Sequence, residues 1–140
     1  MAKEISIQEY LRSLRVLVVD DQEEMRTMLR NMLREIGTNQ VFESCDGKEA
    51  MAFLEAELDL IDVIVCDWNM PKASGVDVLR RLRQSNPDIP FLMVTGRTDK
   101  NSVIEARDNG VSAYIAKPFS SAQLEVKLRV LQQKKVGKAS

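Results

Sequence analysis

Five short apolar runs, separated by segments with helical periodicity, constrain the fold of this chain more than any other feature. Each run spans four or five residues, the usual length of a buried strand. Strands that alternate with helices pair in parallel, and their crossovers are right-handed. The sequence therefore predicts an α/β fold, a doubly wound sandwich with helices on both faces of a five-stranded sheet. We expect the strands at Val16–Val19, Gln40–Ser44, Val63–Cys66, Phe91–Val94 and Ala113–Ala116.

The segments between these runs carry apolar residues at helical spacing. The clearest pattern lies between the first two strands, where a methionine-rich stripe recurs every three or four residues and Gly37 ends it. We interpret this stripe as core packing. Asp46 is expected to cap the next helix, and the arginines of the one after it to form a solvated flank: Arg80, Arg81 and Arg83. Two further helices are predicted, one from Asp99 to Gly110 and one around Leu124–Leu131.

A capping-box pattern precedes the first strand. Ser6 and Glu9 have the spacing in which two side chains satisfy the first helical amides, and Ile5 and Tyr10 are placed as a hydrophobic staple. We predict a short N-terminal helix, which either covers apolar surface or docks a partner. One face of this helix is apolar: Ile7, Leu11 and Leu14.

The residue counts exclude several functions. A net charge of −1 argues against general binding to nucleic acid or to anionic membranes. No segment approaches the ~20 apolar residues of a membrane span, and the N-terminus lacks the apolar run of a signal peptide. Cys45 and Cys66 both end apolar runs, which indicates small buried side chains in a reduced cytoplasm. Because the chain has no histidine, it lacks the imidazole of a catalytic triad, a phosphohistidine or a zinc site.

Acidic residues follow two of the predicted strands at the end where a ligand is expected. In open α/β sheets the ligand crevice lies beyond the carboxyl ends of the strands, where strand order reverses. The first strand ends at Asp20 and Asp21, and the third ends at Asp67. Three converging carboxylates would repel one another, and Mg²⁺ relieves this because it prefers oxygen ligands. The sequence therefore predicts a magnesium site.

Two further strand ends complete the pattern. Thr95 ends the fourth strand and Lys117 ends the fifth, which adds a hydroxyl and an ammonium group to the acids. Together these groups describe a phosphoryl-transfer site in which one aspartate is the nucleophile. Each has an ordinary explanation alone: an acidic pair after a strand often begins a helix, where carboxylates favour the dipole. The interpretation as a phosphoryl-transfer site rests on the presence of these groups together at four strand ends.

The segments VLVVDD, VCDWNMP, MVTG and YIAKPF resemble the receiver domains of two-component response regulators, in matching order and spacing. The DWNMP run is especially similar to the stand-alone, CheY-like chemotaxis receivers. This resemblance implies a flavodoxin-like (βα)5 fold with strand order 2-1-3-4-5. It also sets the predicted boundaries: an N-terminal helical extension at 1–14, a receiver domain at 15–132 and a disordered tail at 133–140.

The resemblance also implies roles for individual residues. Asp67 would be the phosphoacceptor. Mg²⁺ would be bound by Asp21, Asp67 and the main-chain carbonyl of Asn69, with Asp20 acting through water. Lys117 would contact the phosphoryl group and would be joined to Pro118 by a cis peptide bond.

A second group of residues would act after phosphorylation. Thr95 would move toward the phosphoryl oxygens and Tyr114 would turn inward behind it, although Tyr114 on its own reads as a half-buried strand aromatic. Asn69 and Arg97 occupy positions that tune the lifetime of the phosphoryl group in this family. The surface formed by the fourth helix, fifth strand and fifth helix of the receiver would then bind a downstream protein.

The partners follow from the missing histidine. The phosphohistidine donor must belong to a sensor histidine kinase or a histidine phosphotransfer protein, and a phosphatase is an optional further partner. The chain would be a signalling switch that catalyses its own phosphorylation and dephosphorylation, not a metabolic enzyme.

Three alternatives differ in class. A haloacid-dehalogenase-like phosphatase needs a second aspartate where this chain has Asn69, and a dinucleotide-binding domain needs GxGxxG after the first strand. The more serious alternative is a receiver fold that works as a phosphorylation-independent adaptor.

Overall fold

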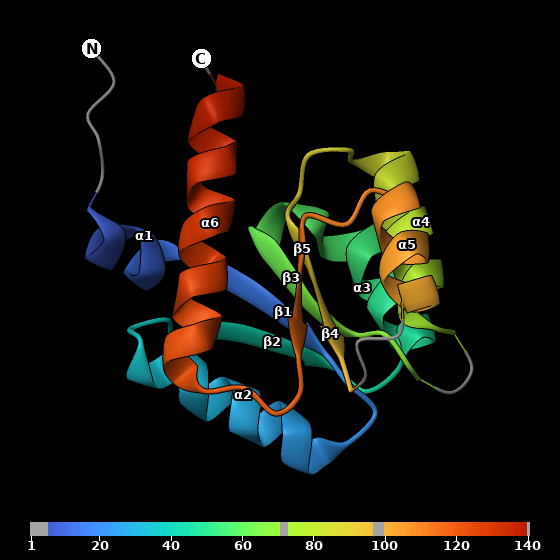
Figure 1. The fold of residues 1–140 in the computed structure, drawn as a ribbon, viewed down its shortest axis with the longest axis horizontal. Coiled ribbons are helices and arrows are strands. Elements are labelled where there is room, and N and C mark those ends of the chain that lie inside the picture. Colours follow the sequence, from blue (N-terminus) through green and yellow to red (C-terminus); the bar gives the residue numbers. More distant parts are fainter. Residues whose placement is uncertain (1–5, 71–72, 97–99, 140) are drawn as a thin grey trace.

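The computed structural model of the chain describes residues 6–70, 73–96 and 100–139, with the backbone alone for 133–139 (Figure 1). Five parallel strands form one sheet in the order β2-β1-β3-β4-β5, which confirms the predicted doubly wound topology. Each predicted strand is present, and β1, β3 and β4 are one residue longer than expected. The strands are β1 Arg15–Val19, β2 Gln40–Ser44, β3 Val63–Asp67, β4 Phe91–Thr95 and β5 Ala113–Ala116.

Helices cover both faces of the sheet (Figure 1). Helices α1, α2 and α6 pack on one face, and α3, α4 and α5 pack on the other. Their bounds are α1 Ile7–Ser13, α2 Glu23–Glu35, α3 Gly47–Glu57, α4 Gly75–Ser85, α5 Lys100–Asp108 and α6 Ser121–Ala139, with a short 3-10 helix at Leu58–Leu60. Among the described residues, none of these helices is both long enough and apolar enough to cross a membrane.

Two hydrophobic cores follow from the alternation of side chains along each strand. Val16 and Val18 of β1 pack in the core under α2 and α6, whereas Leu17 and Val19 pack under α3 and α4. Successive residues of a strand point to opposite faces, so a central strand covered by helices on both sides must be apolar throughout. This is why β1, β3 and β4 read as continuous apolar runs and not as alternating ones.

Helix α1 forms as predicted and completes the first core. The Ser6 hydroxyl accepts a hydrogen bond from the Glu9 amide at 3.1 Å, which caps the helix. Tyr10 and Leu11 are buried in the core under α2 and α6, and the Thr38 hydroxyl donates to the Leu11 carbonyl at 2.6 Å. The contacts support the covering role; Ile5, the other half of the expected staple, lies outside the described residues.

The structure corrects one expectation about the surface. The backbone of α6 continues to Ala139, and the disorder expected for the tail from residue 133 stays a prediction. Arg83 is not part of a solvated flank. Its half-buried guanidinium donates to the carbonyls of Ile89 at 2.6 Å and Gly110 at 2.9 Å, and so ties the loops before β4 and β5 to α4. Arg80 and Arg81 are exposed as expected.

Candidate functional site

The structure brings the three predicted carboxylates together at one edge of the sheet. Asp20 and Asp21 follow β1 directly, Asp67 is the last residue of β3, and these strands are neighbours. One carboxylate oxygen from each residue lies within 4.8 Å of the other two. This is the point where the chain reverses its direction of winding, and therefore the expected ligand crevice.

The carboxylates differ in burial. Asp20 is 1% exposed and Asp67 is 7% exposed, whereas Asp21 is open to solvent. Burial raises the pKa of the Asp67 carboxyl, and the Asp20 and Asp21 charges raise it further; the Lys117 ammonium and the Asn69 amide oppose this shift. The net effect is a raised pKa, so the nearby positive charge compensates this acid only in part.

Lys117 supplies that positive charge from the end of β5. Its Nζ lies 3.5 Å from Oδ2 of Asp20 and 3.7 Å from Oδ2 of Asp67, so one ammonium bridges the two buried acids. The Lys117 amide also donates to the Thr95 carbonyl at 2.7 Å, which joins the ends of β4 and β5. The predicted cis peptide bond between Lys117 and Pro118 is present.

The loop after Asp67 is held closely against the site. The Asn69 amide donates to Oδ1 of Asp67 at 3.3 Å, and the amide of the buried Trp68 donates to the Val94 carbonyl at 2.9 Å. A Cβ at Gly75 would lie 2.7 Å from the Asp67 carbonyl oxygen, so only glycine lets the start of α4 approach this closely. Two residues further along this loop, Pro71 and Lys72, lie outside the described residues.

The proposed switch residues lie on neighbouring strands. Thr95 is buried at the end of β4. Tyr114 pairs with Met93 in the β4–β5 register, so its side chain leaves the sheet on the same face as Thr95. Tyr114 is 39% exposed, with its ring centroid 5.3 Å from Nζ of Lys127, so in this structure it is an exposed strand aromatic and not an inward-turned one. Arg97 lies outside the described residues.

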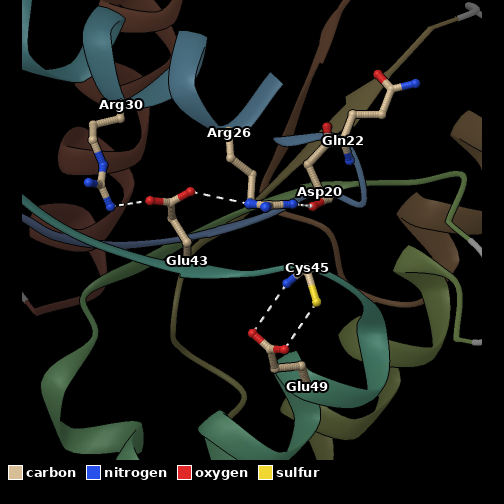
Figure 2. Close-up of polar contacts among 7 residues, drawn as sticks. All are labelled: Asp20, Gln22, Arg26, Arg30, Glu43, Cys45 and Glu49. Carbon is tan, nitrogen blue, oxygen red and sulfur yellow. Dashed lines mark hydrogen bonds and ion pairs between the residues drawn. The ribbon is translucent and has the colours of Figure 1, made fainter. Parts of the chain in front are cut away.

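The sequence reasoning missed a network of arginines beside the acids. Figure 2 shows Arg26 of α2 between the main chain of Asp20 and the side chain of Glu43 on β2. Arg30 pairs with the other carboxylate oxygen of Glu43. The available signal was weak: two arginines one helical turn apart, and an acid in a strand that ends near the site.

The two cysteines differ from each other. Cys66 is fully buried as predicted, and burial raises the pKa of its thiol. The expectation of burial is wrong for Cys45, which is exposed just after β2, an edge strand that helices cover less completely. Its thiol lies 3.1 Å from a Glu49 carboxylate oxygen (Figure 2), and this hydrogen bond, followed by burial, raises the pKa of the thiol. Neither cysteine therefore favours the reactive thiolate.

The donor set fits a magnesium ion. The groups that converge at the site are hard carboxylate oxygens, which Mg²⁺ prefers over nitrogen or sulfur ligands. Asp20 and Asp67 each use one oxygen to accept a main-chain amide and the other to face Lys117, whereas Asp21 is open to solvent. Asp21 is therefore the most accessible of the three carboxylates, and the division of ligand roles that the resemblance implies stays a prediction.

A doubly wound sheet that carries three carboxylates and a lysine at its topological switch point defines a class of acidic-site α/β domains. The sequence model of the response regulator receiver domain matches residues 16–129, and the chain belongs to this family.

Individual relatives agree with this assignment. The chain is 38% identical over 119 residues to chemotaxis protein CheY-3 of Vibrio cholerae, covering 84% of this chain and 90% of that protein. It is 37% identical to chemotaxis protein CheY of Pseudomonas aeruginosa, covering 82% of this chain and 93% of the relative.

Solved structures give the same result. A response regulator receiver domain protein of Clostridium thermocellum superposes with a TM-score of 0.80 at 27% identity, covering 88% of this chain and 98% of that one. Chemotaxis protein CheY4 of V. cholerae superposes with a TM-score of 0.73 at 32% identity, covering 86% and 97% respectively. The chain is therefore a CheY-like receiver of the two-component response regulator family.

Proposed function

We propose that this receiver accepts a phosphoryl group on Asp67 from a phosphohistidine of a sensor histidine kinase or histidine phosphotransfer protein. The observation that carries the proposal is the convergence of Asp67 with Asp20, Asp21 and Lys117 at the ends of three strands. A nearly buried carboxylate whose charge is only partly compensated destabilises the folded protein, and a phosphoryl-acceptor function accounts for its presence.

Magnesium would be held by Asp21, Asp67 and the main-chain carbonyl of Asn69, with Asp20 contributing through water. When bound, the ion would neutralise negative charge on the phosphoryl group during transfer. Asp67 supplies the carboxylate oxygen that forms the new bond to phosphorus, while the bond from phosphorus to the donor imidazole nitrogen breaks. Lys117, between Asp20 and Asp67, orients the phosphoryl oxygens and balances their charge.

The new phosphoryl group would bias a two-state switch. Its oxygens attract the Thr95 hydroxyl, and movement of Thr95 opens space for the Tyr114 ring, which points outward in this structure. Asn69 and Arg97 would tune how long the phosphoryl group survives, and a phosphatase would shorten that time.

The proposed output surface is formed by α5, β5 and α6. A groove of about 320 Å³ lies on it and is lined in part by Tyr114, Phe119, Val126 and Lys127. Tyr114 lines this groove, so a change in its side chain alters the surface that a downstream protein contacts. The CheY relatives point to a chemotaxis partner such as the flagellar motor, and a phosphorelay intermediate is the other pathway we consider. We place this switch in the cytoplasm, acting through proteins and not through nucleic acid.

A phosphotransfer assay tests the proposal. Purified protein is incubated with Mg²⁺ and beryllofluoride, a phosphoryl mimic, and binding is followed by the fluorescence of Trp68, the only tryptophan, which is buried beside the acceptor. In parallel, phosphoryl transfer from a labelled histidine kinase is measured for wild type and Asp67→Asn. We expect both signals in the wild type alone. Undiminished labelling of Asp67→Asn contradicts the proposal.

The alternative function is a phosphorylation-independent adaptor, and helix α1 is the observation that favours it. This helix adds a docked element outside the segment matched by the family model. Partner capture with and without beryllofluoride separates the two functions. Capture that does not change with the mimic, and that is lost when residues 1–14 are removed, favours the adaptor.

A further inference from the structure

Asp20, the most buried acid of the site, is held at three points. Its Oδ1 accepts a hydrogen bond from the Gln22 amide at 2.9 Å, and its Oδ2 lies 3.5 Å from Nζ of Lys117. Its main-chain carbonyl accepts a third bond, at 2.7 Å, from Nη1 of Arg26 (Figure 2). The first two bonds fix the side chain, and the third fixes the backbone.

Arg26 is itself held in place. Its Nε donates to Oε1 of Glu43 at 3.2 Å, and its side chain is only 15% exposed. Arg30 pairs with the second oxygen of the same carboxylate. A guanidinium that is fixed at both ends loses little further entropy when it bonds the acidic loop, and a charged donor makes a stronger bond to a carbonyl than a neutral one.

We propose that Arg26 is a positioning residue of the magnesium site, oriented by Glu43; this rests on the phosphoacceptor function proposed above. The Asp20 carbonyl and the Asp21 amide belong to one planar peptide group. A bond that fixes this carbonyl therefore sets the direction in which the Asp21 backbone, and the carboxylate attached to it, enters the crevice. Arg26 does not coordinate the ion itself, and it acts through the main chain between Asp20 and Asp21.

A purely structural role for Arg26 is the rival explanation, because the same side chain ties α2 to β2. Arg30 offers a matched control. It lies one turn further along α2 and pairs with the same Glu43, on the side away from the acidic loop (Figure 2). Loss of Arg30 therefore weakens the tie between helix and strand without removing the bond to the Asp20 carbonyl.

The experiment compares Arg26→Met, Arg26→Lys, Glu43→Gln and Arg30→Met with the wild type. Mg²⁺ affinity is measured by titration of Trp68 fluorescence, and the free energy of unfolding is measured without Mg²⁺. Amide hydrogen exchange at Asp21 and Gln22 is measured in metal-free protein. We expect Arg26→Met to weaken Mg²⁺ binding about tenfold, the size found for residues that orient metal ligands. We also expect it to speed exchange at these two amides.

The other variants sharpen the inference. Arg26→Lys keeps one donor and Glu43→Gln keeps a neutral acceptor, so both should fall between wild type and Arg26→Met. Arg30→Met should change Mg²⁺ affinity less than twofold, even if it lowers the free energy of unfolding as much as Arg26→Met does. The inference is overturned if Arg26→Met binds Mg²⁺ and exchanges these amides as the wild type does. If Arg26→Met does not fold, the same result in Arg26→Lys and Glu43→Gln overturns it. A wild type that does not bind Mg²⁺ contradicts the proposed function instead.

Discussion

The two ends of the sheet treat charge in opposite ways. At the amino ends of the strands, Arg15 and Asp62 form paired hydrogen bonds at 2.9 and 3.0 Å, and Arg83 donates to backbone carbonyls. At the carboxyl ends, three carboxylates converge and one lysine pairs with two of them. At the amino ends, the charged side chains are matched by hydrogen-bond partners. At the carboxyl ends, the negative charges outnumber the positive one. This difference indicates that the amino end serves stability and the carboxyl end serves function.

The largest expected effect is at the amino end. Arg83→Met should lower the free energy of unfolding by about 3 kcal/mol, because it removes charged hydrogen bonds and leaves the Ile89 and Gly110 carbonyls without this donor. Chemical denaturation of the variant measures the loss. Arg80→Met, an exposed arginine of the same helix, is the matched control and should change stability by less than about 0.5 kcal/mol. If both substitutions lowered the free energy of unfolding equally, the hydrogen bonds of Arg83 would contribute no more to stability than an exposed arginine does, which would contradict this prediction.

The next effect is a pH dependence near α1. Burial, followed by the Asp62 charge, raises the pKa of Tyr10 to about 12 from 10.0. Between pH 10 and 12 the folded protein therefore keeps the Tyr10 proton, whereas the unfolded chain loses it. The contribution of the neutral Tyr10 side chain to the free energy of unfolding is complete below pH 10 and is lost as pH rises toward 12. The loss should be about 2–3 kcal/mol at most, since each pKa unit corresponds to about 1.4 kcal/mol. Stability measured from pH 9 to 12 in wild type and Tyr10→Phe checks this, because the variant should lack the Tyr10 phase; parallel curves would contradict it.

The fold was more predictable from the sequence than the charge network. Apolar runs located the strands because a central strand covered on both faces has no polar position, and Asp46 was identifiable as a cap because the capping bond to Glu49 is local. The acids were found because the ends of parallel strands meet at one edge.

The missed features all depend on long side chains or partial burial. Arg83 bonds a carbonyl 27 residues away, and Arg26 pairs with an acid 17 residues away; no local spacing encodes either contact. Cys45 was misplaced because an apolar run does not show whether its last residue is covered. The contact of the Tyr114 ring with Lys127 was missed because Lys127 belongs to a different element.

A substitution at the carboxyl end should have the opposite sign. Asp67→Asn should raise the free energy of unfolding by about 1 kcal/mol without Mg²⁺ at pH 7, because it removes a buried charge whose pKa is raised in the folded state. The gain should shrink at acidic pH, where wild-type Asp67 is protonated as well. Thermal unfolding at both pH values, with and without Mg²⁺, measures this. Mg²⁺ should stabilise the wild type more than the variant, and a destabilised variant at pH 7 would contradict the contrast between the two ends.

The smallest expected effect concerns Tyr114. The Lys127 ammonium lies 5.3 Å from its ring centroid, a contact that is worth about 0.5–1 kcal/mol at an exposed site. Lys127→Met should therefore reduce the ratio of outward to inward rings roughly two- to fivefold, while Lys127→Arg should preserve it. The ¹⁹F spectrum of fluorotyrosine-labelled protein measures this ratio, with Tyr10 as an internal reference because it is the only other tyrosine. If the Tyr114 signal is the same in all three proteins, the ring is held by β5 and its neighbours and not by the cation, and the output surface is then set by packing instead of by charge.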